Sequence, residues 1–106
     1  MTGTWREHPE ARAELLAAIA HLDDRRTGLG DELLDRVERA IEDILTSPDA
    51  WPPVLHWDDE PRLRNRAVRP FRYRIIYYVV GDTVRIIAYA HESREPGYWA
   101  HRVDSG

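Results

Sequence analysis

The spacing of hydrophobic residues changes once along this 106-residue chain, and that change limits the fold more than any other feature. Up to Thr46 the apolar residues recur every three or four positions, which is typical of amphipathic helices. After Pro61 apolar and polar residues alternate, which is typical of strands. The sequence therefore predicts an α+β protein in which helices precede a sheet.

Two helices are predicted in the first half of the chain. The first covers residues 9–25, because it opens with a proline at the favoured first position and carries an apolar stripe. That stripe consists of Leu15, Ile19 and Leu22. Gly28 is expected to cap this helix in a left-handed conformation. The second helix is expected to begin at Gly30 or Asp31 and to end before Pro48, so the two helices form an antiparallel hairpin.

A loop and a small sheet are predicted to follow. Residues 48–61 contain four prolines and two tryptophans, which indicates a packed loop without regular structure. Residues 62–68, 71–80 and 84–91 are predicted strands, residues 5–8 a weak first strand, and residues 96–102 a turn or short helix. We expect a single domain over residues 1–106, with the helical hairpin packed on an antiparallel sheet of three to four strands.

The charges divide unevenly between the two halves of the chain. Residues 1–61 carry 15 acidic residues and 6 arginines, a net charge of −9, whereas residues 62–106 carry 9 arginines and 4 acidic residues, a net charge of +5. Six of those nine arginines lie between Arg62 and Arg74. A basic half on an acidic protein indicates an anionic partner, either a nucleic acid or an acidic protein segment. The alternative is a charged strand edge that only prevents aggregation.

Several classes of site are not predicted. The chain has no cysteine, which excludes disulfides and thiolate metal sites, and its five histidines lack metal-binding spacing. We therefore predict no metal site and no cofactor. The first residues have no apolar signal core, and the apolar run at residues 75–80 is too short to span a membrane, so a cytoplasmic protein is expected.

Four stretches of the chain, in their order and spacing, are similar to a known family. They are residues 9–15 (PEARAEL), 28–30 (GLG), 70–77 (PFRYRIIY) and 90–99 (AHESREPGYW). Together they resemble the RelE/ParE superfamily of toxins over nearly the whole chain. The resemblance implies the toxin of a type II toxin-antitoxin system, which arrests growth and is neutralised by a cognate antitoxin protein. RelE-like members are ribosome-dependent endoribonucleases that act on mRNA, whereas ParE-like members block DNA gyrase.

The nuclease alternative has candidate residues. Cutting RNA requires a group that accepts the 2′-hydroxyl proton, cations that stabilise the phosphate and an acid for the leaving oxygen. The resemblance to RelE points to Arg74 and Tyr98, and His91 and Arg94 lie nearby in the sequence. The catalytic residues of a nuclease would therefore be Arg74, His91, Arg94 and Tyr98. Whether the chain is an enzyme depends on which branch it follows.

The departures from the RelE pattern favour the ParE branch. RelE-like enzymes carry two lysines where this chain has residues 62–68, and this chain has no lysine. Arginine stays protonated and cannot replace lysine as a base. Glu92 stands where a further catalytic arginine would follow, and its charge would repel phosphate. The alternatives for the single residues are a structural role for His91, a core-covering role for Tyr98, and an ion pair between Arg74 and the second helix.

We therefore expect a ParE-like gyrase inhibitor, with a RelE-like nuclease or an inactive antitoxin-binding relative as alternatives. The strand at residues 62–68 should have one wet, basic face, because its arginines alternate with other residues. A disordered, acidic and amphipathic segment of the antitoxin is expected to bind along this strand and the residues after it. The predicted partner-binding residues are Arg62, Arg64, Arg66, Arg69 and Arg72.

Overall fold

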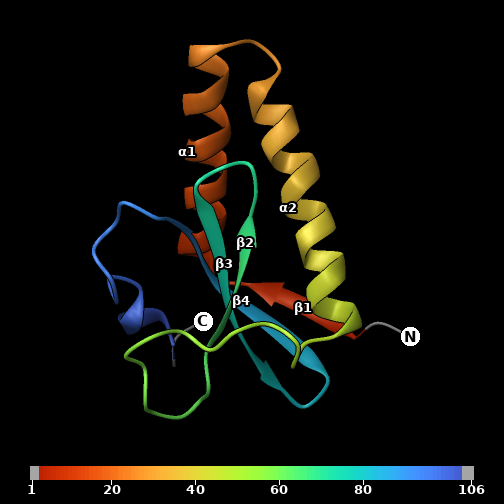
Figure 1. The fold of residues 1–106 in the computed structure, drawn as a ribbon, viewed down its shortest axis with the longest axis vertical. Coiled ribbons are helices and arrows are strands. Elements are labelled where there is room, and N and C mark those ends of the chain that lie inside the picture. The colour runs from red at the N-terminus through yellow and green to blue at the C-terminus, as the bar shows by residue number, and fades with distance from the viewer. Residues whose placement is uncertain (1–2, 104–106) are drawn as a thin grey trace.

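A helical hairpin packed against a twisted sheet makes up the described part of the chain, residues 3–103, in the computed structural model (Figure 1). One strand precedes the hairpin, and the other strands of this part follow it. The elements are β1 (Thr4–Glu7), α1 (Pro9–Arg25), α2 (Leu29–Thr46), β2 (Arg64–Val68), β3 (Tyr73–Val80), β4 (Thr83–His91) and the 3₁₀ helix η1 (Ala100–Arg102). Within residues 3–103 no helix is long and apolar enough to cross a membrane.

Helix α1 has the predicted bounds. Pro9 lies in its first turn, and His8 caps it, because the His8 Nδ1 accepts a hydrogen bond from the Glu10 backbone N–H at 3.1 Å. One face of the helix packs into the core, and its buried residues are Ala11, Leu15, Ala18 and Leu22. Leu16, beside that face, is exposed. The helical spacing of apolar residues therefore predicted both the extent and the buried face of α1.

The connection between the helices depends on two glycines. Gly28 has the predicted left-handed conformation, with φ of 93°, but it is the N-cap of α2, and Arg26 is the C-cap of α1. Gly30 lies where the helices approach each other most closely. A Cβ atom on Gly30 would lie 2.6 Å from the backbone oxygen of Ile19, and the Gly30 N–H donates to Asp23 Oδ1 at 2.8 Å. The hairpin therefore requires glycine at position 30.

The sheet is mixed. Its strand order within the described residues is β1-β4-β3-β2, and β3 pairs antiparallel with both β2 and β4, as predicted. At the edge, β1 pairs parallel with β4. Consecutive strands joined by short turns must be antiparallel, but β1 is separated from β4 by most of the chain, so no turn imposes that direction on it.

The two faces of the sheet contact different parts of the protein. The helix-covered face packs against α1 and α2, and it includes Val68, Ile75, Tyr77, Ile86 and Tyr89. The opposite face, which we call the open face, includes Leu63, Ile76, Tyr78, Ile87, Ala88 and Ala90. Trp99 and Val103 of the C-terminal segment pack on the open face, and Trp57 lies beside them. The open face therefore has its own small apolar cluster.

The proline-rich residues 48–61 form the predicted packed loop. Tyr77 Oη donates to the Pro48 carbonyl at 2.6 Å, and Trp57 Nε1 donates to the Pro61 carbonyl at 2.9 Å. The loop backbone also follows the edge of β2, where the Asn65 N–H donates to the Pro52 carbonyl at 2.9 Å. β2 begins at residue 64, two residues later than predicted, because residues 62 and 63 still belong to the end of this loop.

Candidate functional site

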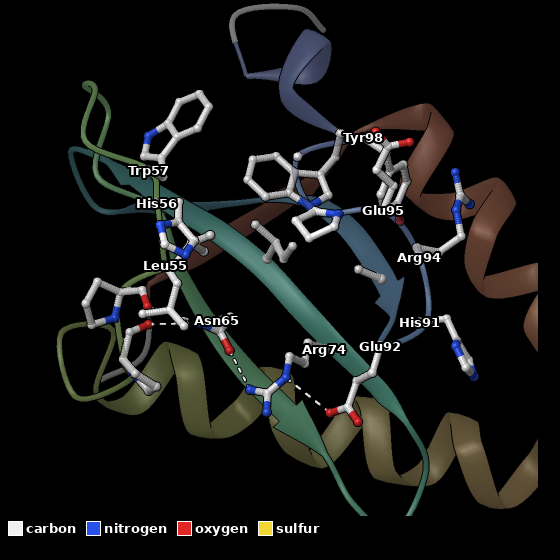
Figure 2. Close-up of a pocket in the computed structure, with 18 of the residues that line it drawn as sticks. Leu55, His56, Trp57, Asn65, Arg74, His91, Glu92, Arg94, Glu95 and Tyr98 are labelled. Carbon is white, nitrogen blue, oxygen red and sulfur yellow. Dashed lines mark hydrogen bonds and ion pairs between the residues drawn. The ribbon is translucent and has the colours of Figure 1, made fainter.

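A groove of about 710 Å³ lies on the open face of the sheet (Figure 2). Ile76 and Ala90 lie at its floor, residues 52–57 form one wall, and residues 94–99 form the other. Arginines at its margin are Arg69, Arg74 and Arg94. An apolar groove with cationic ends is suited to an extended or helical segment of a protein that carries acidic residues beside apolar ones.

Glu92, directly after β4, contacts three of the arginines that the sequence analysis named. Its carboxylate lies 3.2 Å from Arg69 Nη1, 3.9 Å from Arg72 Nε and 3.1 Å from Arg74 Nε. Figure 2 shows Arg74 between Glu92 and Asn65, whose side-chain oxygen accepts a hydrogen bond from Arg74 Nη1 at 2.7 Å. Arg74 thus pairs with Glu92 rather than with an acidic residue of α2, because α2 covers the other face of the sheet.

The helix-covered face carries Arg64 and Arg66. Arg66 pairs across the strands with Ile75, and its Nη2 lies 2.6 Å from Asp43 Oδ2 of α2. The same guanidinium lies 4.7 Å from the ring centroid of Trp51, and Arg64 Nη1 donates to the Trp51 carbonyl at 2.8 Å. The prediction of a wet basic face is therefore wrong for Arg64 and Arg66, because α2 and the proline-rich loop cover that face.

The remaining predicted partner-binding residues, Arg62, Arg69 and Arg72, are exposed. Arg62 precedes β2, and the other two lie in the connection between β2 and β3. These three side chains, together with Arg74, form the accessible part of the arginine-rich region. The cationic surface is therefore smaller than the sequence predicts. Arg69 and Arg74 line the groove, whereas Arg62, which precedes the other end of β2, and Arg72 lie outside its lining.

Arg74 and His91 lie on opposite faces of the sheet, because Arg74 pairs with Ala90 whereas His91 pairs with Tyr73. His91 Nδ1 accepts a hydrogen bond from the Ser93 backbone N–H at 3.0 Å. The His91 ring packs edge-on against Tyr73, with their centroids 4.9 Å apart. Figure 2 shows the His91 side chain turned away from Arg74. These contacts agree with the structural alternative for His91.

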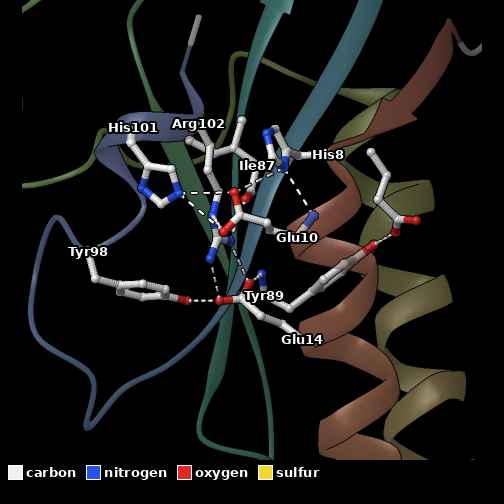
Figure 3. Close-up of polar contacts among 9 residues, drawn as sticks. His8, Glu10, Glu14, Ile87, Tyr89, Tyr98, His101 and Arg102 are labelled. Carbon is white, nitrogen blue, oxygen red and sulfur yellow. Dashed lines mark hydrogen bonds and ion pairs between the residues drawn. The ribbon is translucent and has the colours of Figure 1, made fainter. Parts of the chain in front are cut away.

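Tyr98 contacts α1 and two arginines. Its Oη donates a hydrogen bond to Glu14 at 2.5 Å (Figure 3). Burial raises the pKa of Tyr98, and the hydrogen bond to Glu14 raises it further. The guanidinium carbons of Arg94 and Arg102 lie 3.8 and 5.2 Å from the Tyr98 ring centroid. Because burial and Glu14 hold the phenol in its neutral form, Tyr98 is poorly suited to transfer a proton at neutral pH.

Glu14 is the centre of this second polar cluster. It receives hydrogen bonds from Arg102 Nη1 at 2.9 Å, from Arg102 Nη2 at 3.1 Å and from the Tyr89 backbone N–H at 3.1 Å. Arg102 Nη1 also donates to the Ile87 carbonyl at 3.0 Å. Burial acts to lower the pKa of Arg102, but the hydrogen bond to Glu14 together with the nearby charges of Glu14 and Glu10 outweighs it, and the pKa is raised. The cluster therefore fixes the C-terminal segment to α1 and β4.

Comparison with known proteins decides the family. The model of the ParE toxin of type II toxin-antitoxin systems, parDE, matches residues 6–96. The chain belongs to the ParE toxin family. A solved structure described as "Chromosomal ParDE TA system from P. aeruginosa" aligns with a TM-score of 0.72 and 11% sequence identity, over 85% of this chain and 96% of that chain. At this identity the alignment shows a shared fold. No curated protein matches the sequence.

The ParE assignment confirms the predicted family and its closer branch. The family match ends at residue 96, so part of one groove wall in this ParE-family chain lies beyond it. That part contains Tyr98, which binds Glu14, and Trp99, which packs on the open face; Arg102, which also binds Glu14, follows it in the chain. Among residues 3–103 no cluster of histidine, aspartate and glutamate is arranged to hold a metal ion.

Two residues that organise the candidate site were not singled out from the sequence, namely Glu14 and Arg102. A signal for Glu14 exists, because it lies three residues after Ala11 and four before Ala18 and so borders the buried stripe of α1. A carboxylate beside such a stripe requires a partner. Nothing in the local pattern around Arg102 indicates that this partner lies 88 residues along the chain.

Proposed function

We propose that this ParE-family chain arrests growth by binding DNA gyrase in the cytoplasm, and that a cognate antitoxin neutralises it. Inhibition by binding needs a surface and no nucleophile. The observation that supports this proposal is the arrangement of the nuclease candidates: Arg74 pairs with Glu92, Tyr98 bonds Glu14, and His91 lies on the opposite face from Arg74. A ribonuclease site would require these groups to converge on one phosphate.

The direct test uses purified gyrase. Toxin added to gyrase, ATP and relaxed plasmid should prevent supercoiling, and addition of the antitoxin beforehand should restore it. Full supercoiling in the presence of excess folded toxin would contradict gyrase as the target. Because this assay contains no ribosome, it does not respond to a RelE-like activity.

The antitoxin is proposed to present an acidic, amphipathic segment to the exposed arginines and the groove. Arg69 and Arg74 lie beside the apolar floor at one end of the groove, and Arg94 lies in its other wall. Apolar side chains of the segment would cover Ile76, and its carboxylates would contact the arginines. A segment that is disordered when free would lose conformational entropy on binding, which the buried apolar surface offsets.

Charge reversal tests this binding mode. Arg69→Glu combined with Arg72→Glu should weaken antitoxin binding about tenfold and reduce its salt dependence. Arg36→Glu combined with Arg39→Glu, on the exposed face of α2, makes the same change in net charge away from the groove. Equal affinities for the two double variants, measured by titration calorimetry, would remove the arginine-rich region from the antitoxin interface.

A further inference from the structure

Glu92 stands at the centre of the arginine cluster and is less exposed than its partners. Its side chain is 20% exposed, whereas the side chains of Arg69, Arg72 and Arg74 are 59%, 77% and 39% exposed. The Glu92 backbone N–H donates to the Arg72 carbonyl at 2.8 Å, which holds the turn after β4 against the connection between β2 and β3. The carboxylate is therefore positioned by the backbone on one side and by guanidinium groups on the other.

The Glu92 carboxylate lies among the guanidinium groups that an external anion would need, and Arg69 Nη1 donates a hydrogen bond to its Oε1 at 3.4 Å. Arg69 and Arg74 approach it at 3.2 and 3.1 Å through N–H groups that also suit phosphate oxygens. A phosphate that approached these two arginines would have to displace Glu92 or accept its repulsion at short range. Glu95 also lines the groove, but it has no such contact with Arg69 or Arg74 in the described structure.

We propose that Glu92 is a specificity-determining residue that prevents the arginine-lined groove from binding nucleic acid while it remains open to a protein segment. The inference rests on the proposed function, in which the groove receives protein. Affinity for nucleic acid comes mainly from phosphate contacts, so the negative charge of Glu92 beside Arg69 and Arg74 lowers it. A protein segment depends less on these cations, because it also gains from apolar contact with the floor around Ile76 and Ala90, which Glu92 does not obstruct.

The test measures binding of a twelve-nucleotide oligouridylate by fluorescence anisotropy between 50 and 300 mM salt. Glu92→Gln keeps the side-chain size and removes the charge. For single strands, the logarithm of the binding constant falls with the logarithm of the salt concentration, with a slope of about −0.7 per phosphate contact. Each freed arginine adds one such contact and should therefore tighten binding about eightfold at 50 mM salt. We expect a slope steeper by about 0.7 to 1.4 for Glu92→Gln, because Arg69 and Arg74 become available.

Glu95→Gln is the matched control, because it removes the same charge from the same groove without freeing these arginines. It should leave the salt slope unchanged, and Arg74→Gln added to Glu92→Gln should abolish about half of the gain, because Arg69 remains available. Glu92→Ser serves as a second variant if thermal unfolding shows that Glu92→Gln has lost its fold. Equal slopes for wild type, the folded Glu92 variant and Glu95→Gln would overturn the inference.

This outcome is independent of the gyrase assay. A protein that inhibits gyrase but gains no oligonucleotide affinity on loss of Glu92 would retain the proposed function and lose this inference. A protein that leaves gyrase active but gains oligonucleotide affinity on loss of Glu92 would lose the proposed function and retain this inference.

Discussion

The phenol of Tyr98 donates a 2.5 Å hydrogen bond to Glu14, which lies 84 residues earlier in the chain. The same carboxylate accepts two bonds from Arg102, whose side chain is 6% exposed against 16% for Glu14 (Figure 3). Glu14 therefore ties the C-terminal segment, and with it one wall of the groove, to α1, and Glu10 adds a 3.0 Å contact with His101.

Removing the Glu14 carboxylate should destabilise the fold. Glu14→Gln leaves the buried Arg102 charge without its principal partner, which costs about 3 kcal/mol, whereas Tyr98→Phe loses one bond to a charged acceptor and costs about 1.5–3 kcal/mol. Urea unfolding followed by circular dichroism measures both. Glu38→Gln, on the exposed face of α2, is the control and should stay within about 0.5 kcal/mol of wild type. Equal stabilities of Glu14→Gln and Glu38→Gln would show that the cluster does not hold the segment.

Substitutions of the arginines in and beside β2 should fall into two groups, those that lower the stability of the fold and those that weaken antitoxin binding. Arg66→Ala removes the 2.6 Å contact with Asp43 and the stacking on Trp51, and it should lower the free energy of unfolding by about 1–2 kcal/mol. Arg62→Ala, at an exposed position, should change it by less than about 0.5 kcal/mol. Thermal unfolding of the two variants checks the difference. If Arg66→Ala weakened antitoxin binding without a change in stability, our placement of Arg66 in the first group would be incorrect.

The raised pKa values of the buried tyrosines predict that the protein loses stability at alkaline pH. Burial raises the pKa of Tyr77 to about 12, and it also raises the pKa values of Tyr73, Tyr89 and Tyr98. In the unfolded chain tyrosine titrates near pH 10, so the unfolded state loses protons first as the pH rises. The contribution of Tyr77 to stability is therefore complete below about pH 10 and declines between about pH 10 and pH 12.

Tyrosinate absorbance at 295 nm follows this titration, and the chain has no lysine or cysteine whose ionisation would change stability in the same pH range. Urea unfolding at pH 9 and pH 11 should show the lower stability at pH 11, and Tyr77→Phe should reduce the difference. Ionisation of all tyrosines together near pH 10 in the folded protein would rule out this source of pH dependence.

The helical hairpin should tolerate substitution at one glycine and not at the other. Gly30→Ala places a Cβ 2.6 Å from the Ile19 carbonyl oxygen, so the helices must separate at a cost of about 1–3 kcal/mol. Gly28→Asn should cost less than about 1 kcal/mol, because no atom lies within 4 Å of the added Cβ and asparagine accepts the left-handed conformation. Comparable thermal midpoints for the two variants would contradict the close approach of α1 and α2.

Local signals in the sequence were sufficient to predict where the helices form. Pro9 and the spacing of Leu15, Ile19 and Leu22 predict α1 over the residues that form it. The strands were predicted with errors of one or two residues at their ends, but the parallel pairing of β1 with β4 was not, because no local residue determines the direction of an edge strand that is distant in sequence.

The site was less predictable, because alternation assigns residues to two faces without indicating which face is covered. Arg64 and Arg66 alternate as an exposed strand would, yet α2 and Trp51 cover them. Whether Arg74 and His91 share a face depends on the register between β3 and β4, which a shift of one residue would reverse. The expectation that Glu92 would repel phosphate followed from its place in the RelE pattern and its charge, whereas its three arginine contacts required the structure.

The most direct test of the central claim, inhibition by binding and not by RNA cleavage, adds one preparation of folded toxin to a coupled transcription-translation extract on a relaxed template and follows both message length and template supercoiling. We predict that the message stays full-length and that gyrase fails to supercoil the template. Cleaved messages with normal supercoiling, abolished by Arg74→Ala in a protein that remains folded, would contradict the account.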